Sequence, residues 1–197
     1  ACRLVFGGVP KMIIHDAGLE FRGSAPSAGK QKTIDAIILH HSASNGTVRS
    51  VHEYHKSLGW WGIGYHYFIE ADGKIYRGRP EEFVGAHAGS SNDYNTHSIG
   101  ICLSGNFELT EPTPEQYQSL RWLIDDIKAR YNIKEVLKHK DITATACPGK
   151  NFDIDKMQSI MKYTVCLGEY DTKAEAVAVA GILKKWFSDI RVDYQEV

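Results

Sequence analysis

The sequence predicts an α/β fold, in which helices cover the faces of a β-sheet. Short runs of β-branched and apolar residues alternate with segments of helical periodicity between residues 33 and 160. With 197 residues, 43% of them hydrophobic, the chain is large enough for one domain with a full core. From residue 163 the pattern restarts as a short strand, a helix and a strand. We therefore expect one domain over residues 12–160 and a small C-terminal βαβ module over residues 163–197.

The first part of the predicted domain contains a loop, a strand and a helix. Residues 21–32 are small and polar, with Pro and Gly among them, and predict a loop. The run "TIDAIIL" at 33–39 is too short for a helix and predicts a buried strand. Thr47 is placed to cap a helix that ends before Gly59. The predicted buried face of this helix consists of Val48, Val51, His52, His55 and Leu58.

The middle of the chain predicts a β-hairpin followed by a further strand. In "GYHYFIEADGKIYRGR", two β-rich runs flank Ala71, Asp72 and Gly73, and this pattern is typical of a hairpin. A polar loop at residues 85–97 then leads into "SIGICLSG" at 98–105, which predicts another strand.

The clearest helix begins after Thr113. Pro114 occupies the first helical position, and Gln116 completes a capping box with Thr113. Beyond this helix, "KEVLKH" predicts a short strand and "FDIDKMQSIMK" a short helix. The predicted buried stripe of the long helix consists of Tyr117, Leu120, Ile124, Ile127 and Tyr131.

The composition argues against several classes of partner. A formal net charge of −1 gives no electrostatic basis for binding nucleic acid or an anionic membrane. No apolar run approaches the roughly 20 residues needed to cross a bilayer, and the N-terminal segment lacks the apolar core of a secretion signal. The four cysteines are too scattered for a disulfide framework, so we expect reduced thiols.

Two separate stretches end strands with metal-binding residue types. The apolar run "IILHH" stops at His40 and His41, which point to opposite faces of a strand, and the spacing does not decide which one faces a site. His139 follows a second apolar run, and Cys147 lies eight residues later. Two nitrogens and one sulfur suit zinc, and three protein ligands leave a fourth position open for catalysis.

Two other interpretations of these residues stay open on spacing alone. Cys147 and His139 could instead form a nucleophile pair, or the histidines could be structural residues at strand ends. Thr145 lies two residues before Cys147, so an extended segment would direct both side chains the same way. A hydroxyl beside a metal-bound water is well placed to donate to a developing oxyanion.

Six motifs occur together in one order: "IILHHSAS", "GWWGIGYHYFIEADGKIYRGR", "VGAHA", "NTHSIGICLSGNF", "TPEQYQSLRWLI" and "HKDITATACPG". They cover roughly residues 33–150. This set resembles the type 2 N-acetylmuramoyl-L-alanine amidases, the family shared by phage endolysins and peptidoglycan recognition proteins.

The resemblance implies a fold, a cofactor and a set of metal ligands. It implies a central mixed β-sheet flanked by helices, with a Zn²⁺ ion in a groove. His40, His139 and Cys147 match the three zinc ligands. Tyr65 of "GYHY" matches the tyrosine that contacts the attacking water, and Thr145 matches a residue that stabilises the oxyanion.

The same resemblance implies substrate-binding positions. His87 and Asn95 match residues that line the groove for bacterial peptidoglycan. Trp61, with Trp60 beside it, could form an aromatic wall of this groove or pack in the core. In one departure, Cys102 stands where some members carry a glutamate base.

The resemblance implies zinc-dependent hydrolysis of the amide bond between N-acetylmuramic acid and L-alanine, by a phage or prophage endolysin. Such a lysin stays in the cytoplasm until it is released to the cell wall, although export by another route is an alternative. A second hypothesis is a recognition module that binds peptidoglycan without cutting it. A third is a cysteine peptidase that uses Cys147.

The module at residues 163–197 resembles the opening half of a sporulation-related wall-binding repeat. Because only one half is present, two chains could combine as a homodimer to complete it. The alternative is a helical cap that stabilises the catalytic domain.

Overall fold

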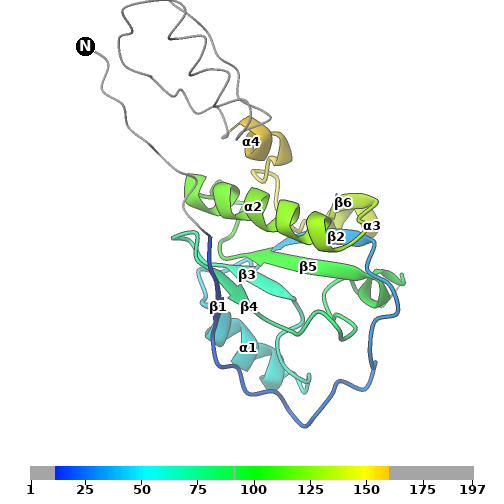
Figure 1. Cartoon of the computed structure of the whole chain (residues 1–197). Helices are drawn as coiled ribbons and strands as arrows, with labels where there is room; N and C mark the ends of the chain where they lie inside the picture. Colours follow the sequence, from blue (N-terminus) through cyan, green and yellow to red (C-terminus); the bar gives the residue numbers. More distant parts are fainter. Residues whose placement is uncertain (1–11, 91, 160–197) are drawn as a thin grey trace, which may run out of the picture. The chain divides into compact units, whose positions relative to one another are not determined.

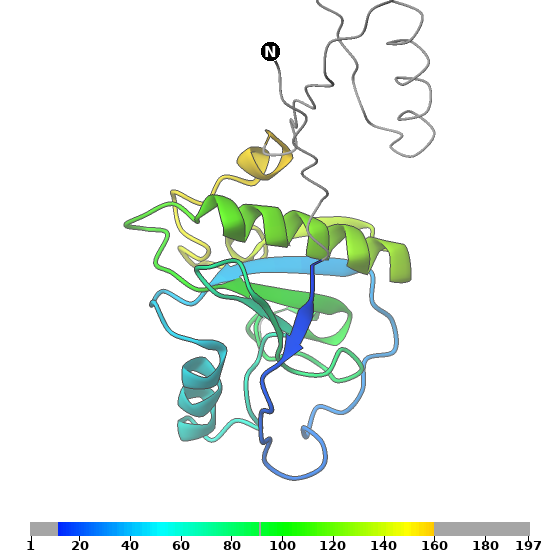
Figure 2. The ribbon, with the colours of Figure 1, turned by 60° about the vertical axis from the view of Figure 1, so that its left-hand side comes forward.

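The computed structural model describes residues 12–90 and 92–159, all within one compact unit that spans Lys11–Lys162. Six strands form one mixed sheet, and helices lie on both of its faces (Figures 1 and 2). The predicted α/β fold with a mixed sheet is therefore confirmed, whereas the C-terminal module lies outside the described residues. The elements are β1 (Ile14–Asp16), β2 (Ala36–His41), α1 (Val48–Ser57), β3 (Tyr67–Ile69), β4 (Ile75–Arg77), η1 (Tyr94–Thr96), β5 (Ser98–Leu103), α2 (Pro114–Arg130), β6 (Glu135–Lys138), α3 (His139–Ile142) and α4 (Ile154–Ser159).

The strands follow the order β1-β4-β3-β5-β2-β6. At the centre, β2 pairs in parallel with both β5 and β6, and β3 joins β5 in parallel. The predicted hairpin is confirmed, because β3 and β4 are antiparallel and Gly73 adopts a φ of +83° in the turn between them. The three-residue strand β1, which pairs with β4, was not predicted because it is too short to show a period.

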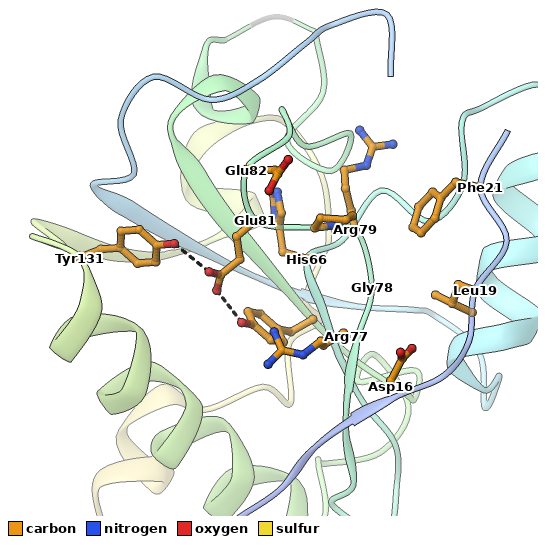
Figure 3. Close-up of a pocket in the computed structure, with 12 residues that line it drawn as sticks. Asp16, Leu19, Phe21, His66, Arg77, Gly78, Arg79, Glu81, Glu82 and Tyr131 are labelled. Atoms are coloured by element: carbon orange, nitrogen blue, oxygen red, sulfur yellow. Dashed lines mark hydrogen bonds between the residues drawn. The ribbon is translucent and has the colours of Figure 1, made fainter. Parts of the chain in front are cut away.

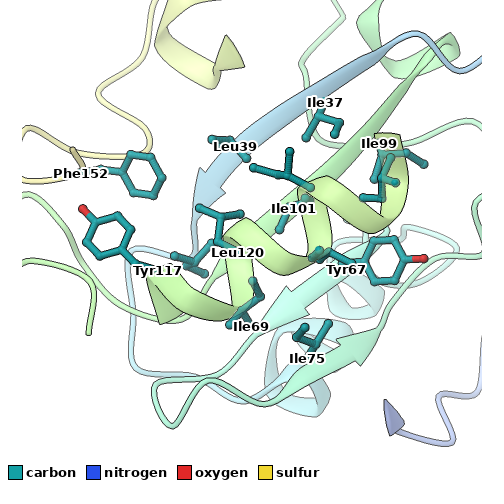
Figure 4. Packing of buried hydrophobic residues seen from close by; sticks show 14 of the residues in the cluster. Ile37, Leu39, Tyr67, Ile69, Ile75, Ile99, Ile101, Tyr117, Leu120 and Phe152 are labelled. Atoms are coloured by element: carbon teal, nitrogen blue, oxygen red, sulfur yellow. The ribbon is translucent and has the colours of Figure 1, made fainter. Parts of the chain in front are cut away.

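Alternation along the strands divides the interior into two cores. Ile37, Leu39 and Ile101 face α2, which lies across one side of the sheet (Figure 4). On the opposite side, Phe68 and Cys102 pack with residues of α1. A set of apolar α2 side chains completes the first core: Tyr117, Leu120, Leu123, Ile124 and Ile127.

The predicted helix starts are confirmed by their capping bonds. The Thr113 hydroxyl accepts the backbone N–H of Gln116 at 3.1 Å, and the Gln116 side chain accepts the backbone N–H of Thr113 at 3.1 Å. Thr47 caps α1 by accepting the N–H of Ser50 at 3.2 Å.

Two predicted core positions differ in the structure. Leu58 is 51% exposed, because α1 ends at Ser57 and Leu58 has left the helical face. Tyr131 is only partly buried at the end of α2, where its hydroxyl donates to Glu81 at 2.8 Å. Among residues 12–90 and 92–159, no helix has the length and apolar character needed to cross a membrane.

We predict that Leu120→Ala lowers the free energy of unfolding by about 2–5 kcal/mol, because it empties a fully buried position between α2 and the sheet. The measurement is urea denaturation followed by circular dichroism. Leu109→Ala is the matched control, since Leu109 is 78% exposed and its loss should cost less than about 0.5 kcal/mol. Equal losses in the two variants would contradict the described core.

Candidate metal centre

Strand register brings His40 and His139 together. In the parallel pair of β2 and β6, Leu39 lies opposite Lys138, so the next residues along the two strands are neighbours. Their ring centroids are 4.6 Å apart. Cys147 approaches from the following loop, and its Sγ lies 3.7 Å from His40 Nδ1. The candidate ligand atoms of the three residues all lie within 4.8 Å of one another.

The structure also distinguishes the two adjacent histidines. His40 is completely buried and lies opposite Cys102 in the register of β2 and β5, on the α1 side of the sheet. His41 points the other way, where its Nδ1 accepts the backbone N–H of Phe107 at 3.0 Å. His40 therefore belongs to the cluster, and His41 holds a neighbouring loop.

The loop that carries Cys147 is fixed by backbone contacts. The N–H of His41 donates to Cys147 Sγ at 3.4 Å, and the N–H of Lys140 donates to the Cys147 carbonyl at 2.8 Å. Thr145 is exposed, and its Oγ1 accepts the N–H of Cys147 at 3.3 Å. That bond uses a lone pair of the hydroxyl and leaves its proton available to an outside acceptor.

The donor set fits a zinc ion in chemistry and in spacing. His139 Nε2 is buried and has no hydrogen-bond partner among the described residues, as expected of an atom reserved for a ligand. A tetrahedral zinc ion with ordinary bond lengths separates a nitrogen and a sulfur ligand by about 3.6 Å. The observed 3.7 Å between His40 Nδ1 and Cys147 Sγ agrees with that value.

Burial controls the protonation of these groups. Burial, and then the neighbouring His139, hold the pKa of His40 well below its usual value, and burial also lowers the pKa of His139. Both rings are therefore neutral near pH 7 and keep a lone pair for a metal. Burial raises the pKa of the Cys147 thiol to about 11. A thiol of this kind is a poor nucleophile by itself, which argues against a Cys–His pair.

Tyr65 lies beside the cluster, with its ring centroid 5.1 Å from that of His40. Burial, followed by the nearby thiols of Cys102 and Cys147, raises its pKa well above the usual value, so the phenol stays protonated. Cys102 is itself completely buried, and burial raises its pKa. A neutral thiol thus occupies the position where some amidases of the resembled family carry a glutamate.

Of the two predicted substrate residues, His87 contacts His40 and Asn95 binds the backbone on either side of His87. His87 Nδ1 lies 3.1 Å from His40 Nε2. Asn95 Oδ1 accepts the backbone N–H groups of His87 at 2.8 Å and Ala88 at 2.9 Å, and its Nδ2 donates to the Gly89 carbonyl at 2.7 Å. Asn95 therefore positions the His87 segment, while substrate contact by either residue stays a prediction.

The two adjacent tryptophans lie in different surroundings. Trp61 packs against Phe21, with ring centroids 4.2 Å apart, and against Phe83 at 5.2 Å. Trp60 is 39% exposed and packs on His55, with ring centroids 4.6 Å apart. The contacts of Trp61 are those of a packing residue, and its predicted role in a substrate wall stays a prediction.

Sequence reasoning did not foresee the tasks of the histidines around Tyr65. His55 Nδ1 accepts the N–H of Gly64 at 3.1 Å. His66 Nδ1 accepts the N–H of Gly100 at 3.0 Å, and its Nε2 donates to the Phe83 carbonyl at 3.1 Å. The three bonds hold the residues on either side of Tyr65, and the sequence signal for them is the concentration of histidines in this part of the chain.

The cluster lies outside the hollow shown in Figure 3, which has a volume of about 470 Å³. In that hollow, Glu81 accepts hydrogen bonds from Tyr67, Arg130 and Tyr131. Its acidic group is thus engaged in joining the β4–β5 connection to the end of α2. The lining includes none of the three candidate metal ligands.

Comparison with known proteins identifies the relatives of this chain. Residues 30–150 match the profile of the family described as N-acetylmuramoyl-L-alanine amidase. The endolysin of Enterobacteria phage T3 is 38% identical over 133 residues, which are 63% of this chain and 85% of the phage protein. The peptidoglycan-recognition protein SC1a of Drosophila melanogaster is 33% identical over 141 residues, or 65% of this chain and 75% of that protein. Among solved structures, the N-acetylmuramoyl-L-alanine amidase LysC from Clostridium intestinale URNW aligns with a TM-score of 0.68 at 36% identity, covering 77% of this chain and 99% of that chain.

We predict that Cys147 of the metal-free protein is alkylated slowly by iodoacetamide at neutral pH. Its pKa of about 11 leaves little thiolate, so the rate should rise about tenfold per pH unit from about pH 7 to about pH 10. Mass spectrometry of the Cys147 peptide measures this rate separately from those of the other cysteines. A rate that has already levelled off near neutral pH would indicate an activated thiolate and restore the nucleophile pair.

Proposed function

The chain belongs to the N-acetylmuramoyl-L-alanine amidase family, and from this premise we propose that it hydrolyses the bond between N-acetylmuramic acid and L-alanine in bacterial peptidoglycan with the aid of zinc. The observation that carries the zinc proposal is the convergence of His40, His139 and Cys147, whose ligand atoms lie within 4.8 Å of one another. His40 lies 107 residues before Cys147 in the sequence, whereas His139 and Cys147 belong to one short segment. Their chemistry suits zinc. A bound zinc ion supplies Lewis acidity, which polarises a carbonyl and lowers the pKa of water.

The neighbouring side chains supply orientation and hydrogen bonds. We assign to Tyr65 the orientation of the attacking water, because its ring lies beside that of His40 and its phenol stays protonated. Thr145 retains a hydroxyl proton that can be donated to the carbonyl oxygen as negative charge develops there. Water adds to the carbonyl carbon, the C–N bond breaks, and the amine of L-alanine leaves with a proton.

We further assign the chain to the phage or prophage endolysins, on the strength of its similarity to the endolysins of phages T3 and T7. An endolysin acts once it has been released to the cell wall. The module at residues 163–197 would add wall binding or pairing of two chains. The similarity to a peptidoglycan-recognition protein leaves binding without cleavage as the second candidate. The complete ligand set favours the enzyme.

We predict that the purified protein releases new L-alanine amino termini from peptidoglycan without releasing reducing sugars. A zinc chelator should abolish this activity, and added zinc should restore it. Cleavage that survives thorough chelation would contradict the zinc proposal, and wall binding without cleavage would favour the recognition module.

His139→Ala should lower the rate at least about 10³-fold, since it removes a ligand. His15→Ala, at a strand residue remote from the cluster, is the control.

We predict that Tyr65→Phe lowers kcat about 10²-fold, because the variant keeps the ring but loses the hydroxyl that orients the water. Zinc content, measured by atomic absorption, should stay at the wild-type level. Tyr54→Phe serves as the control at an exposed tyrosine of α1 and should be fully active. Unchanged kcat in Tyr65→Phe would remove Tyr65 from the mechanism.

A further inference from the structure

We propose that His87 is a positioning residue that fixes the His40 ring in the tautomer needed to bind the metal. The inference rests on the proposed function to the extent that it assigns a metal to the cluster. It gives His87 a task distinct from the substrate contact predicted from sequence.

The contact between the two rings is direct and enclosed. His40 Nε2 and His87 Nδ1 are 3.1 Å apart. The ring planes are nearly perpendicular, at 78°, with centroids separated by 5.0 Å. His40 is completely buried and His87 is 6% exposed, so water has little access to compete for this bond.

The two ring nitrogens of His40 face different partners, and metal binding through one of them requires one tautomer. Nδ1 lies 3.7 Å from Cys147 Sγ, so it is the atom directed into the metal cluster. A neutral imidazole that offers a lone pair at Nδ1 carries its proton at Nε2. That proton is then donated to His87 Nδ1. In the opposite tautomer, His40 would place a proton at Nδ1 and block the metal position.

Among residues 12–90 and 92–159, the His87 ring has one hydrogen-bond partner. Its Nε2 is buried without a partner there, and its Nδ1 makes the bond to His40. The hydrogen bond of the His87 ring is thus directed at His40, as expected of a residue that orients a metal ligand from behind.

The surrounding chain is built to hold this ring in place. Asn95 accepts the backbone N–H groups of His87 and Ala88. Gly85 and Gly100 leave room for the imidazole, because a Cβ at either position would lie 2.5 Å from His87 Cδ2. Neither glycine has a positive φ, so the requirement there is for space.

The test compares three variants at one position. His87→Asn retains an acceptor near the place of Nδ1, His87→Gln carries its amide farther from the backbone, and His87→Phe keeps a ring without an acceptor. We expect zinc affinity, measured by competition with a chromophoric chelator, to fall about 10–100-fold in His87→Phe and His87→Gln. His87→Asn should stay close to wild type, and His15→Phe is the control for an unrelated histidine.

A second measurement needs no metal. Long-range ¹H–¹⁵N NMR of the metal-free protein reports which nitrogen of His40 is protonated, and we expect Nε2–H in the wild type and in His87→Asn, but a mixture in His87→Phe. Equal zinc affinity in all variants, with an unchanged His40 tautomer, overturns the inference. If His87→Phe does not fold, the contrast between Asn and Gln decides, and equal behaviour of those two overturns it. A wild-type protein that binds no zinc counts against the proposed function, whereas the NMR result still tests the role of His87.

Discussion

The site depends on the parallel pairing of β2 between β5 and β6. This register fixes which side chains of β2 face each side of the sheet, and a shift by one residue would exchange them. It places His40 beside Cys102 on the α1 side and makes His139 its neighbour at the end of β6. The apolar packing of α2 against Ile37 and Leu39 stabilises the same register from the other side. Fold stability and ligand placement are thus two results of one pairing.

Burial has a second effect, which is chemical. The cluster lies at the C-terminal end of β2, a central strand, where its groups are partly or fully buried. Desolvation there keeps the imidazoles of His40 and His139 neutral, and the thiol of Cys147 protonated in the absence of a cation. Neutral imidazoles can bind a metal, whereas a protonated thiol is a poor nucleophile. A bound divalent cation would lower the pKa of the thiol, so that the sulfur binds as a thiolate. The same residues that spacing left ambiguous are therefore distinguished by their environment.

The sequence predicted the parts of the structure that depend on local patterns. Thr113 and Gln116 marked the start of α2 through their hydrogen-bonding groups, and an apolar run marked β2. Residue spacing could not choose between His40 and His41, because the choice depends on which face of the strand meets the loop of Cys147. Only the family resemblance indicated His40. The contact of His87 with His40 was also beyond local reasoning, since it requires the 85–97 segment to fold over Gly100.

The carboxylate of Glu81 connects the sheet to the end of α2. It accepts hydrogen bonds from Tyr67 of β3 and from Arg130 and Tyr131 at the end of α2. One side chain thus joins Tyr67 to Arg130, which lies 63 residues later in the sequence. Burial opposes its charge, but the hydrogen bonds from Arg130, Tyr67 and Tyr131 prevail and keep the pKa of Glu81 below its ordinary value of 4.5. Stabilisation from a group of this kind is complete above the ordinary pKa and disappears only as the pH falls through the lower, folded-state value. The hydrogen bonds of Glu81 between the β3–β4 hairpin and α2 therefore keep their full stabilising effect at mildly acidic pH, above the ordinary pKa of the carboxyl group.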